Sequence, residues 1–351
     1  MCNALPGLLS ALLLCGTIGT ARAADFTLGT ATAQSGRKAT GFLQVPAGID
    51  PATDIPVAVL NGARPGPTLA LVAGSHGTEY ASIVALQKMI QTVDPADIAG
   101  VLIIVPLVNP GSFEQKVLHL NPVDGKNMNR FYPGKIDGTQ TERSLWAITK
   151  QVVERCDYLI DFHGGDIDEN LLPYSYWLKT GNSSLDTVTR GMVLAFGFDH
   201  IIIATDRPTD PNDSRYLDST AITRGKASIT VEAGRASTTD AKDIDALISG
   251  SLDVMRYLKM LPGAATPVEH PVWIGKISIL TSDRDAVFYP LVAPQMYMQQ
   301  SMRIGYLTDF FGSKVQDVTA PVSGIVLLIG ALPSLKKGDN IIYIGEIANA
   351  P

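Results

Sequence analysis

The chain has only three cysteines among its 351 residues, and two of them, Cys2 and Cys15, lie near the N-terminus. If the N-terminal segment is removed, as argued below, Cys156 alone remains, and one cysteine cannot form a disulfide within the chain. Cys156 ends an apolar segment, which favours a small core residue over a reactive thiol. The sequence therefore predicts a mature protein without internal disulfides.

The chain also lacks an excess of basic residues, long charged blocks, low-complexity runs and internal repeats. Its net charge is -6 and its isoelectric point is near 5.4, which argues against nucleic acid as a partner. Hydrophobic residues make up 46% of the chain, enough material for a sizeable core. A chain of this length predicts more than one domain, or one large domain with an appendix.

The apolar run at residues 8–18 is too short to span a bilayer, so we expect no stable membrane insertion. It leads to Ala21-Arg22-Ala23, a small-x-small motif typical of signal-peptide cleavage sites. Residues 1–7 hold no Lys or Arg, unlike the usual basic start of a signal peptide, and a buried N-terminal helix is the alternative. We expect residues 1–23 to be a signal peptide and the mature protein to be exported, with the periplasm as its destination.

One candidate site lies between a predicted strand and a predicted helix. His76 and Glu79 directly follow the apolar, β-favouring run 67–73 and precede residues 80–90, whose apolar residues recur at helical spacing. We expect Glu79 in the first helical turn, where the helix dipole favours an anion. Both side chains then face the crevice beyond the carboxyl end of the strand, where open α/β sheets bind ligands.

Two further strand ends carry the same kind of residue. His163 ends the apolar run 157–162 and is followed by two glycines, and Glu232 ends the β-branched run 227–231. A carboxylate in such a run is rarely buried without a purpose. Asp161 shares a strand face with His163, so it either orients a metal ligand or makes an ordinary strand-end hydrogen bond.

Together these residues describe a catalytic zinc site. His76, Glu79 and His163 form a His₂Glu ligand set for one zinc ion per chain, which leaves a coordination position open for water. Glu232 is then placed to take the proton of that water. The pattern predicts a metal-dependent hydrolase.

The chain resembles the succinylglutamate desuccinylase/aspartoacylase family of zinc-dependent amidohydrolases, in the zinc carboxypeptidase clan, from about residue 55 to residue 234. Besides the four residues above, the resemblance rests on residues 124–131, Asp-Gly-Lys-Asn-Met-Asn-Arg-Phe. The family likeness implies that His76, Glu79 and His163 bind zinc and that Glu232 is the general base and later the general acid. It also implies that Asn129 and Arg130 hold the carboxylate of the substrate, a role suited to the planar donors of a guanidinium.

The chain departs from the family pattern in two places. Many relatives place an arginine shortly before this segment, where it polarises the scissile carbonyl, but His119 stands at that position here. Either His119 replaces the arginine, or it is a loop histidine and zinc acts with another donor, such as Arg215 or Arg224. Arg215 is also a candidate for binding an anionic group, with a surface ion pair as the alternative. Asn127 replaces the usual aspartate and removes a negative charge beside Arg130.

Strands and helices alternate as far as about residue 260, which predicts an α/β domain with a mostly parallel sheet flanked by helices, as in zinc carboxypeptidases. Residues 266–351 are predicted to be all-β and resemble a barrel-sandwich hybrid of the lipoyl and biotinyl type, although no hairpin tip with a modifiable lysine is evident. The predicted domains are thus 24–265, the zinc hydrolase domain, and 266–351, the β-rich domain.

Together with these patterns, the family likeness implies a deacylase that hydrolyses the amide bond of an N-acyl amino acid or a related small amide. One alternative is an exported zinc carboxypeptidase or amidase that acts on cell-wall or other short peptides by the same chemistry. Two others belong to different classes: a zinc-binding protein without catalysis, and a carrier or interaction module built on the β-rich domain. The sequence does not indicate an oligomeric state.

Overall fold

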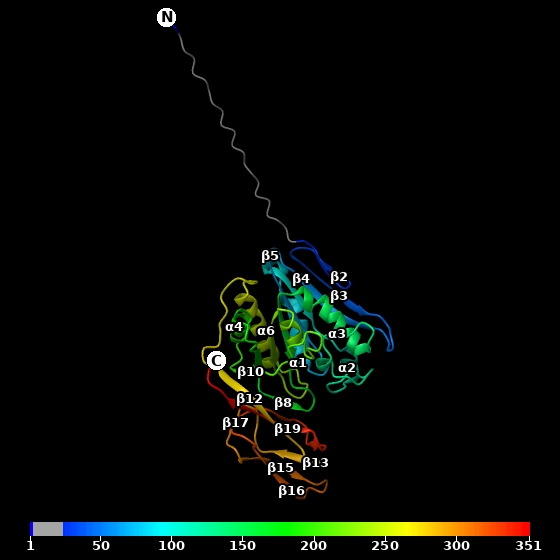
Figure 1. The fold of residues 1–351 in the computed structure, drawn as a ribbon, viewed down its shortest axis with the longest axis vertical. Helices are drawn as coiled ribbons and strands as arrows, with labels where there is room; N and C mark the ends of the chain where they lie inside the picture. Colours follow the sequence, from blue (N-terminus) through cyan, green and yellow to red (C-terminus); the bar gives the residue numbers. More distant parts are fainter. Residues whose placement is uncertain (3–23) are drawn as a thin grey trace.

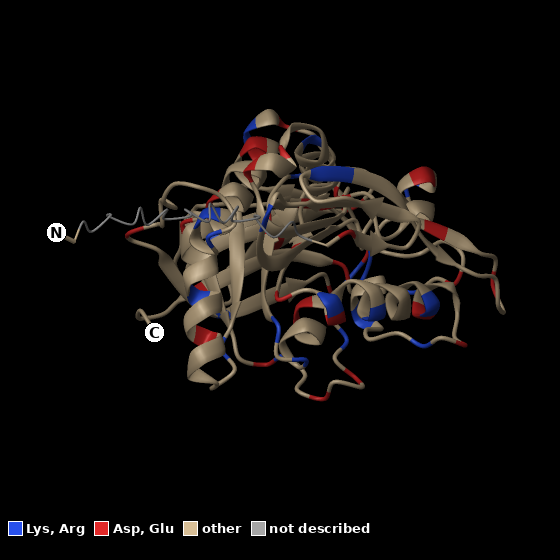
Figure 2. Ribbon diagram, turned by 90° about the horizontal axis from the view of Figure 1, so that it is seen from above, with Lys and Arg blue, Asp and Glu red and all other residues tan. Residues whose placement is uncertain are grey.

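The computed structural model describes residues 1–2 and 24–351 (Figure 1). The predicted signal peptide therefore lies outside the described residues, apart from its first two, and its cleavage stays a prediction. In the described part of the chain, no helix is long and apolar enough to cross a bilayer. Acidic and basic residues are interspersed along the ribbon rather than gathered by sign (Figure 2).

A large mixed sheet forms the centre of the α/β region. In spatial order its strands here are β3 (Arg37–Val45), β4 (Thr53–Asn61), β6 (Ala99–Val105), β5 (Arg64–Ala73), β7 (Tyr158–His163), β11 (Ala227–Glu232), β9 (Tyr174–Leu178) and β10 (His200–Ala204). Strands β6, β5, β7 and β11 are parallel, whereas β4 runs antiparallel to β6, and β9 runs antiparallel to β11. The predicted α/β class is confirmed, with a parallel centre inside a mixed sheet.

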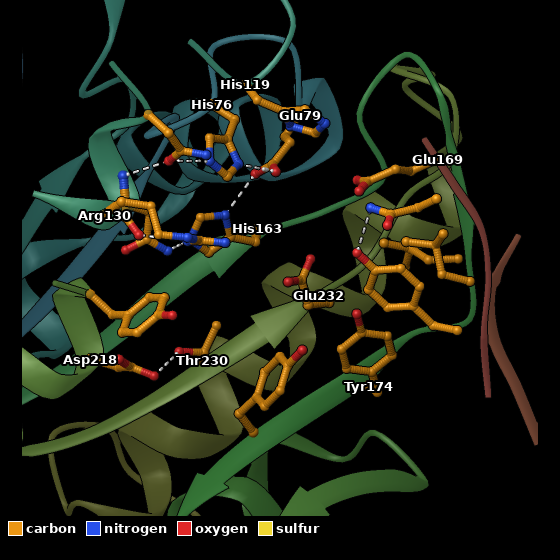
Figure 3. Close-up of a pocket in the computed structure, with 18 of the residues that line it drawn as sticks. His76, Glu79, His119, Arg130, His163, Glu169, Tyr174, Asp218, Thr230 and Glu232 are labelled. Carbon is orange, nitrogen blue, oxygen red and sulfur yellow. Dashed lines mark hydrogen bonds and ion pairs between the residues drawn. The ribbon is translucent and has the colours of Figure 1, made fainter. Parts of the chain in front are cut away.

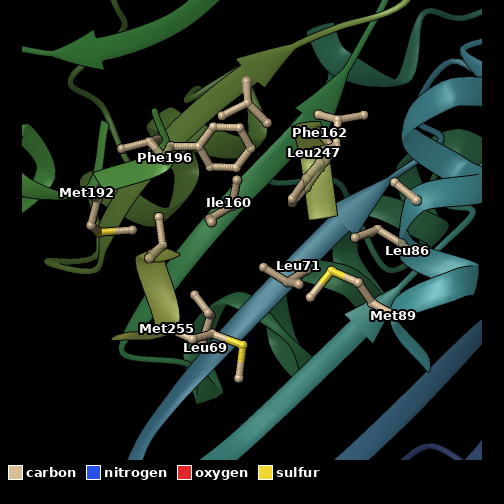
Figure 4. Close-up of a cluster of buried hydrophobic side chains, with 14 of the residues drawn as sticks. Leu69, Leu71, Leu86, Met89, Ile160, Phe162, Met192, Phe196, Leu247 and Met255 are labelled. Carbon is tan, nitrogen blue, oxygen red and sulfur yellow. The ribbon is translucent and has the colours of Figure 1, made fainter. Parts of the chain in front are cut away.

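Helices cover both faces of this sheet. One face packs against α1 (Tyr80–Thr92), α4 (Ser183–Phe196) and α6 (Ala241–Tyr257), and the other against α3 (Gln140–Gln151) and α5 (Leu217–Ile222). Alternation along β5 shows why its sequence is continuously apolar: Leu69 and Leu71 enter the first core (Figure 4), and Ala70 and Val72 enter the second. Both faces of a central strand must therefore be hydrophobic.

The C-terminal region is all-β and continues the main sheet. β12 (Val272–Thr281) pairs in parallel with β10 and antiparallel with β19 (Asn340–Ile347), so the sheet crosses the predicted domain boundary, which itself stays a prediction. Strands β17 (Gly324–Gly330) and β14 (Tyr297–Met298) extend this sheet. A second sheet contains β16 (Lys314–Thr319), β15 (Arg303–Thr308), β13 (Ala286–Pro290) and β18 (Ser334–Leu335).

Short elements complete the described chain: β1 (Phe26–Leu28), β2 (Ala31–Ala33), β8 (Glu169–Leu171), α2 (Pro110–Gln115), and the 3₁₀ helices η1 (Pro95–Asp97), η2 (Met128–Arg130) and η3 (Val153–Arg155). The predicted strands and helices around the site are present with bounds shifted by a few residues. One placement was wrong: Glu79 is the N-cap residue of α1 rather than part of its first turn. Its carboxylate points to the histidines instead of capping the helix.

Candidate active site

Three strand ends bring the predicted catalytic residues together (Figure 3). Strands β7 and β11 are parallel neighbours, and their register places His163 beside Glu232. On the other side of β7, Ala73 at the end of β5 pairs with Phe162, so the following loop delivers His76 and Glu79 to the same edge. Parallel pairing thus converts distant sequence motifs into one site.

His76, Glu79 and His163 converge as a metal-ligand set. The Nδ1 atom of His76 lies 2.6 Å from Oε1 of Glu79, and the Nδ1 atom of His163 lies 3.0 Å from Oε2. Their ligand atoms are all within 4.8 Å of one another, and all three residues are buried. Burial would raise the pKa of Glu79, but the two imidazoles outweigh it and hold this pKa at about 2. Glu79 is therefore an anion, as a ligand must be.

The second nitrogen of each imidazole has its own polar neighbours. Nε2 of His76 lies 3.1 Å from Oδ1 of Asn127, whereas Nε2 of His163 lies 3.0 Å from the amide nitrogen of Asn129 and 3.3 Å from Oδ1 of Asp161, an ion-pair contact without hydrogen-bond geometry. These contacts engage the Nε2 side of each ring and leave both Nδ1 atoms facing Glu79, where a metal would bind. The residues therefore fit a zinc ion, and Asn127, which was predicted beside Arg130, instead accepts from His76.

Glu232 faces this centre from the end of β11 (Figure 3). Among residues 24–351, no side chain forms a hydrogen bond to its carboxylate. Burial raises the pKa of Glu232 well above its usual value, and the nearby carboxylates of Glu79 and Glu169 add to this effect against the opposing influence of His163. A carboxyl group in this setting is suited to accept a proton and to give it back.

The site opens into a pocket of about 270 Å³. Residues of the α/β region and of the C-terminal β region line it together. They are His76, Glu79, His119, Asn127, Asn129, Arg130, His163, Glu169, Leu171, Tyr174, Tyr176, Arg207, Tyr216, Asp218, Thr230, Glu232, Leu328, Asn340 and Tyr343. The last three come from β17 and β19, so the C-terminal region closes one side of the pocket. Such a mostly polar pocket suits a small charged molecule.

Asn129 and Arg130 both line the pocket. The Asn129 amide accepts the backbone N–H of Leu217 at 3.1 Å and lies 3.0 Å from Nε2 of His163, so protein groups already occupy much of its bonding capacity. Arg130 donates through Nη1 to the carbonyl oxygen of Asn129 at 2.6 Å, and its guanidinium lies over the ring of Tyr216. Arg130 keeps its remaining donors for a ligand.

His119 lies at the pocket, with its ring centre 5.3 Å from that of His76. Its Nδ1 is 3.0 Å from Asp166 and its Nε2 is 3.5 Å from Asp168. Burial lowers the pKa of His119, but hydrogen bonds to these two carboxylates raise it to about 11. His119 is thus a cation at the place where the family likeness led us to expect an arginine, and both of its ring nitrogens are paired with aspartates.

Arg215 and Arg224 do not line the pocket. Arg215 is exposed and pairs with Asp213 at 3.2 Å, which is the surface ion pair considered as its alternative role. Arg224 donates to the carbonyl oxygens of Thr220 and Pro211. Because neither arginine lines the pocket, neither is placed to polarise a carbonyl bound there.

Sequence reasoning missed several pocket residues, above all Arg207, Tyr216, Asp218, Glu169 and Tyr343. A buried carboxylate in the apolar segment of Asp218 was the one available signal, because acidic residues are rarely buried without a role. Glu169 is similar: burial raises its pKa to about 7. Arg207 and Tyr343 reach the pocket only through long-range packing.

Comparison with known proteins gives a consistent picture. The family model of the succinylglutamate desuccinylase/aspartoacylase catalytic domain matches residues 65–258. The N-alpha-acetyl-L-2,4-diaminobutyric acid deacetylase of Halomonas elongata is 27% identical over 322 residues, which are 88% of this chain and 92% of the relative.

Two solved structures show the same fold, each with a TM-score of 0.79. A succinylglutamate desuccinylase from Silicibacter sp. TM1040 is 24% identical, with coverage of 89% of this chain and 95% of that one. The product-bound ectoine utilization protein EutE (DoeB) from Ruegeria pomeroyi is 23% identical, with coverage of 88% and 95%. The shared fold therefore includes the C-terminal β region.

Proposed function

Because the chain belongs to the succinylglutamate desuccinylase/aspartoacylase family, we propose that it is a zinc-dependent deacylase that cleaves the amide bond of an N-acyl amino acid. One observation carries the proposal: a buried His₂Glu set lies beside an unpaired glutamate, Glu232, across two parallel strands. A ligand set of this type with an adjacent base is the arrangement of hydrolytic zinc sites.

His76, Glu79 and His163 would hold the zinc, which when bound supplies a water of lowered pKa and polarises the scissile carbonyl. Glu232 accepts the proton of the attacking water and returns it to the leaving amine. Asn127 contacts Nε2 of His76, and Asn129 and Asp161 contact Nε2 of His163, so that these side chains keep the two imidazoles oriented. Arg130 binds the carboxylate of the substrate, and Asn129, whose carbonyl oxygen accepts from the Arg130 guanidinium, assists it.

N-Acetyl amino acids are the first substrates to test, because the relative from Halomonas elongata is a deacetylase of an N-acetyl amino acid. A carboxypeptidase or amidase acting on short peptides would use the same residues and is distinguished from a deacylase only by its substrates.

We also propose export to the periplasm, from the signal-peptide pattern of residues 1–23. Sequencing the N-terminus of the secreted mature chain tests this, with a start at Ala24 expected.

The decisive experiment combines metal analysis with Glu232→Gln. We expect about one zinc per chain in both proteins, but turnover of N-acetyl amino acids should fall by roughly 10²-fold or more in the variant, because glutamine cannot accept a proton. Glu114→Gln, outside the pocket, is the matched control and should keep full activity. Unchanged turnover in Glu232→Gln would assign the base to another group, and zinc binding without any turnover would indicate a non-catalytic zinc protein.

A further inference from the structure

Arg207 brings a second guanidinium group into the pocket, from the loop between β10 and α5. Its side chain is mostly buried, and its Nε has no hydrogen-bond partner in the described part of the chain. The carboxylate of Asp218 is 3.5 Å from Nε, which compensates charge without making a good hydrogen bond. A buried cation with unmet donors is costly unless a ligand satisfies them.

Two tyrosines fix the position of this guanidinium. It lies 4.2 Å from the ring centre of Tyr216 and 5.2 Å from that of Tyr176. Such cation–π contacts orient the planar group and leave its edge free for hydrogen bonds. The nearby negative charge of Asp218 also raises the pKa of Arg207, so the cation is permanent.

Asp218 is itself held rigidly and links Arg207 to the catalytic strand. Its Oδ2 accepts the hydroxyl of Thr230 at 3.0 Å, and the residue is almost fully buried. Thr230 precedes Glu232 by two residues on β11, so the two side chains share one face of the strand. Asp218 thus ties Arg207 to the level of Thr230, and Thr230 lies roughly 7 Å along the strand from the general base Glu232.

Arg130 meets the same tyrosine. Its guanidinium lies 4.9 Å from the ring centre of Tyr216, but one of its terminal amino groups is already engaged by the Asn129 carbonyl. Taking the deacylase function proposed above as given, we propose that Arg207 and Arg130 jointly bind the carboxylate of the substrate's amino-acid half. Arg207 supplies the planar donor edge that Arg130 has partly used, and it determines the preference for a free carboxylate.

The test compares the zinc-loaded wild type and Arg207→Lys on an N-acetyl amino acid and on its carboxamide. Lysine keeps the charge but cannot form a two-pronged contact, so kcat/KM on the acid should fall by about 10- to 100-fold. On the carboxamide, kcat/KM should fall by less than about 3-fold, since this compound has no carboxylate to bind. The matched control is Arg215→Lys, at an exposed arginine outside the pocket, and it should leave kcat/KM unchanged on both substrates.

Equal losses on the acid and on the amide, or no loss on either, would overturn the role of Arg207. Unaltered zinc content and melting temperature show that the variant is folded. If the wild type hydrolyses neither compound, the deacylase function fails instead. Calorimetric titration with the free amino acid and its amide then tests Arg207 separately: a preference for the acid that is lost in Arg207→Lys supports the subsite, and an equal affinity overturns it.

Discussion

At the residue scale, the catalytic centre depends on a carboxylate that does not face the pocket. Asp161 is 1% exposed, and its Oδ1 lies 3.3 Å from Nε2 of His163, on the side of the ring away from Glu79. Burial raises the pKa of Asp161, while the charge and hydrogen bond of His163 oppose this shift. Asp161 thus places a buried negative charge beside the His163 ring, on the side opposite Nδ1.

Asp161→Asn should therefore weaken zinc binding by roughly 10- to 100-fold, because an amide lacks the negative charge that supports the His163 ring from behind. Competition with a chelator of known affinity measures the change. Asp157→Asn, four residues earlier and without contact to the histidines, serves as the control. A zinc affinity that stays the same in Asp161→Asn would show that the charge of Asp161 does not support His163 as a ligand.

Much of this centre could be predicted from single residues. His76, Glu79, His163 and Glu232 follow apolar runs, and that context alone placed them at one edge of a sheet. The surroundings could not be predicted in the same way: Asn127 contacts Nε2 of His76, and His119 is paired with two aspartates. Those contacts depend on loop conformations that have no periodic signal in the sequence.

At the element scale, the start of α3 anchors the loop that carries Asn127, Asn129 and Arg130. Glu142 accepts the backbone N–H of Thr139 at 3.0 Å and pairs with Lys126 at 2.9 Å, just before this loop segment. Burial raises the pKa of Glu142, but these partners outweigh it and lower the pKa to about 2. The Glu142 carboxylate thus joins the start of α3 to the loop that carries Asn127, Asn129 and Arg130.

A depressed pKa in the folded state means that this stabilisation is complete above the unfolded value near 4.3 and is lost as the pH falls towards 2. Glu142→Gln keeps the size and the helix-cap bond but removes the charge, so we expect a loss of about 1 kcal/mol near pH 6. The gap to the wild type should close as the pH approaches 2. Thermal melting across this range measures it.

Glu154→Gln is the control, since Glu154 pairs with Lys150 at 2.7 Å on a more exposed surface and should contribute little. A stability difference between Glu142→Gln and the wild type that is constant with pH would refute an ionic origin of the stabilisation.

The strands and helices themselves were predictable from their apolar periodicity. The antiparallel insertion of β9 between β11 and β10 was not, because the order of strands in a sheet depends on long-range pairing.

At the scale of the whole molecule, the pocket belongs to two regions at once. β12 extends the sheet from β10 into the C-terminal region, and β17 pairs with β8, so that Leu328 lies opposite Leu171. Both of these leucines line the pocket. The sequence predicted a β appendix but not which of its residues reach the site, because alternating apolar residues look the same whether they face a ligand or another strand.

Leu327 lies at the centre of the hydrophobic cluster that joins the two regions, together with Leu172, Tyr174 and Ile274, and it is fully buried. Leu327→Ala should lower the free energy of unfolding by about 2–5 kcal/mol through cavity formation. Because the same cluster supports Leu171 and Leu328, we also expect KM to rise by roughly 2- to 10-fold as the pocket wall loosens. Leu307→Ala, in the separate core of the C-terminal sheets, should cost similar stability with KM unchanged. Melting curves and KM are measured for both variants. A KM in Leu327→Ala equal to that in Leu307→Ala would mean that the C-terminal region stabilises the fold without shaping the pocket.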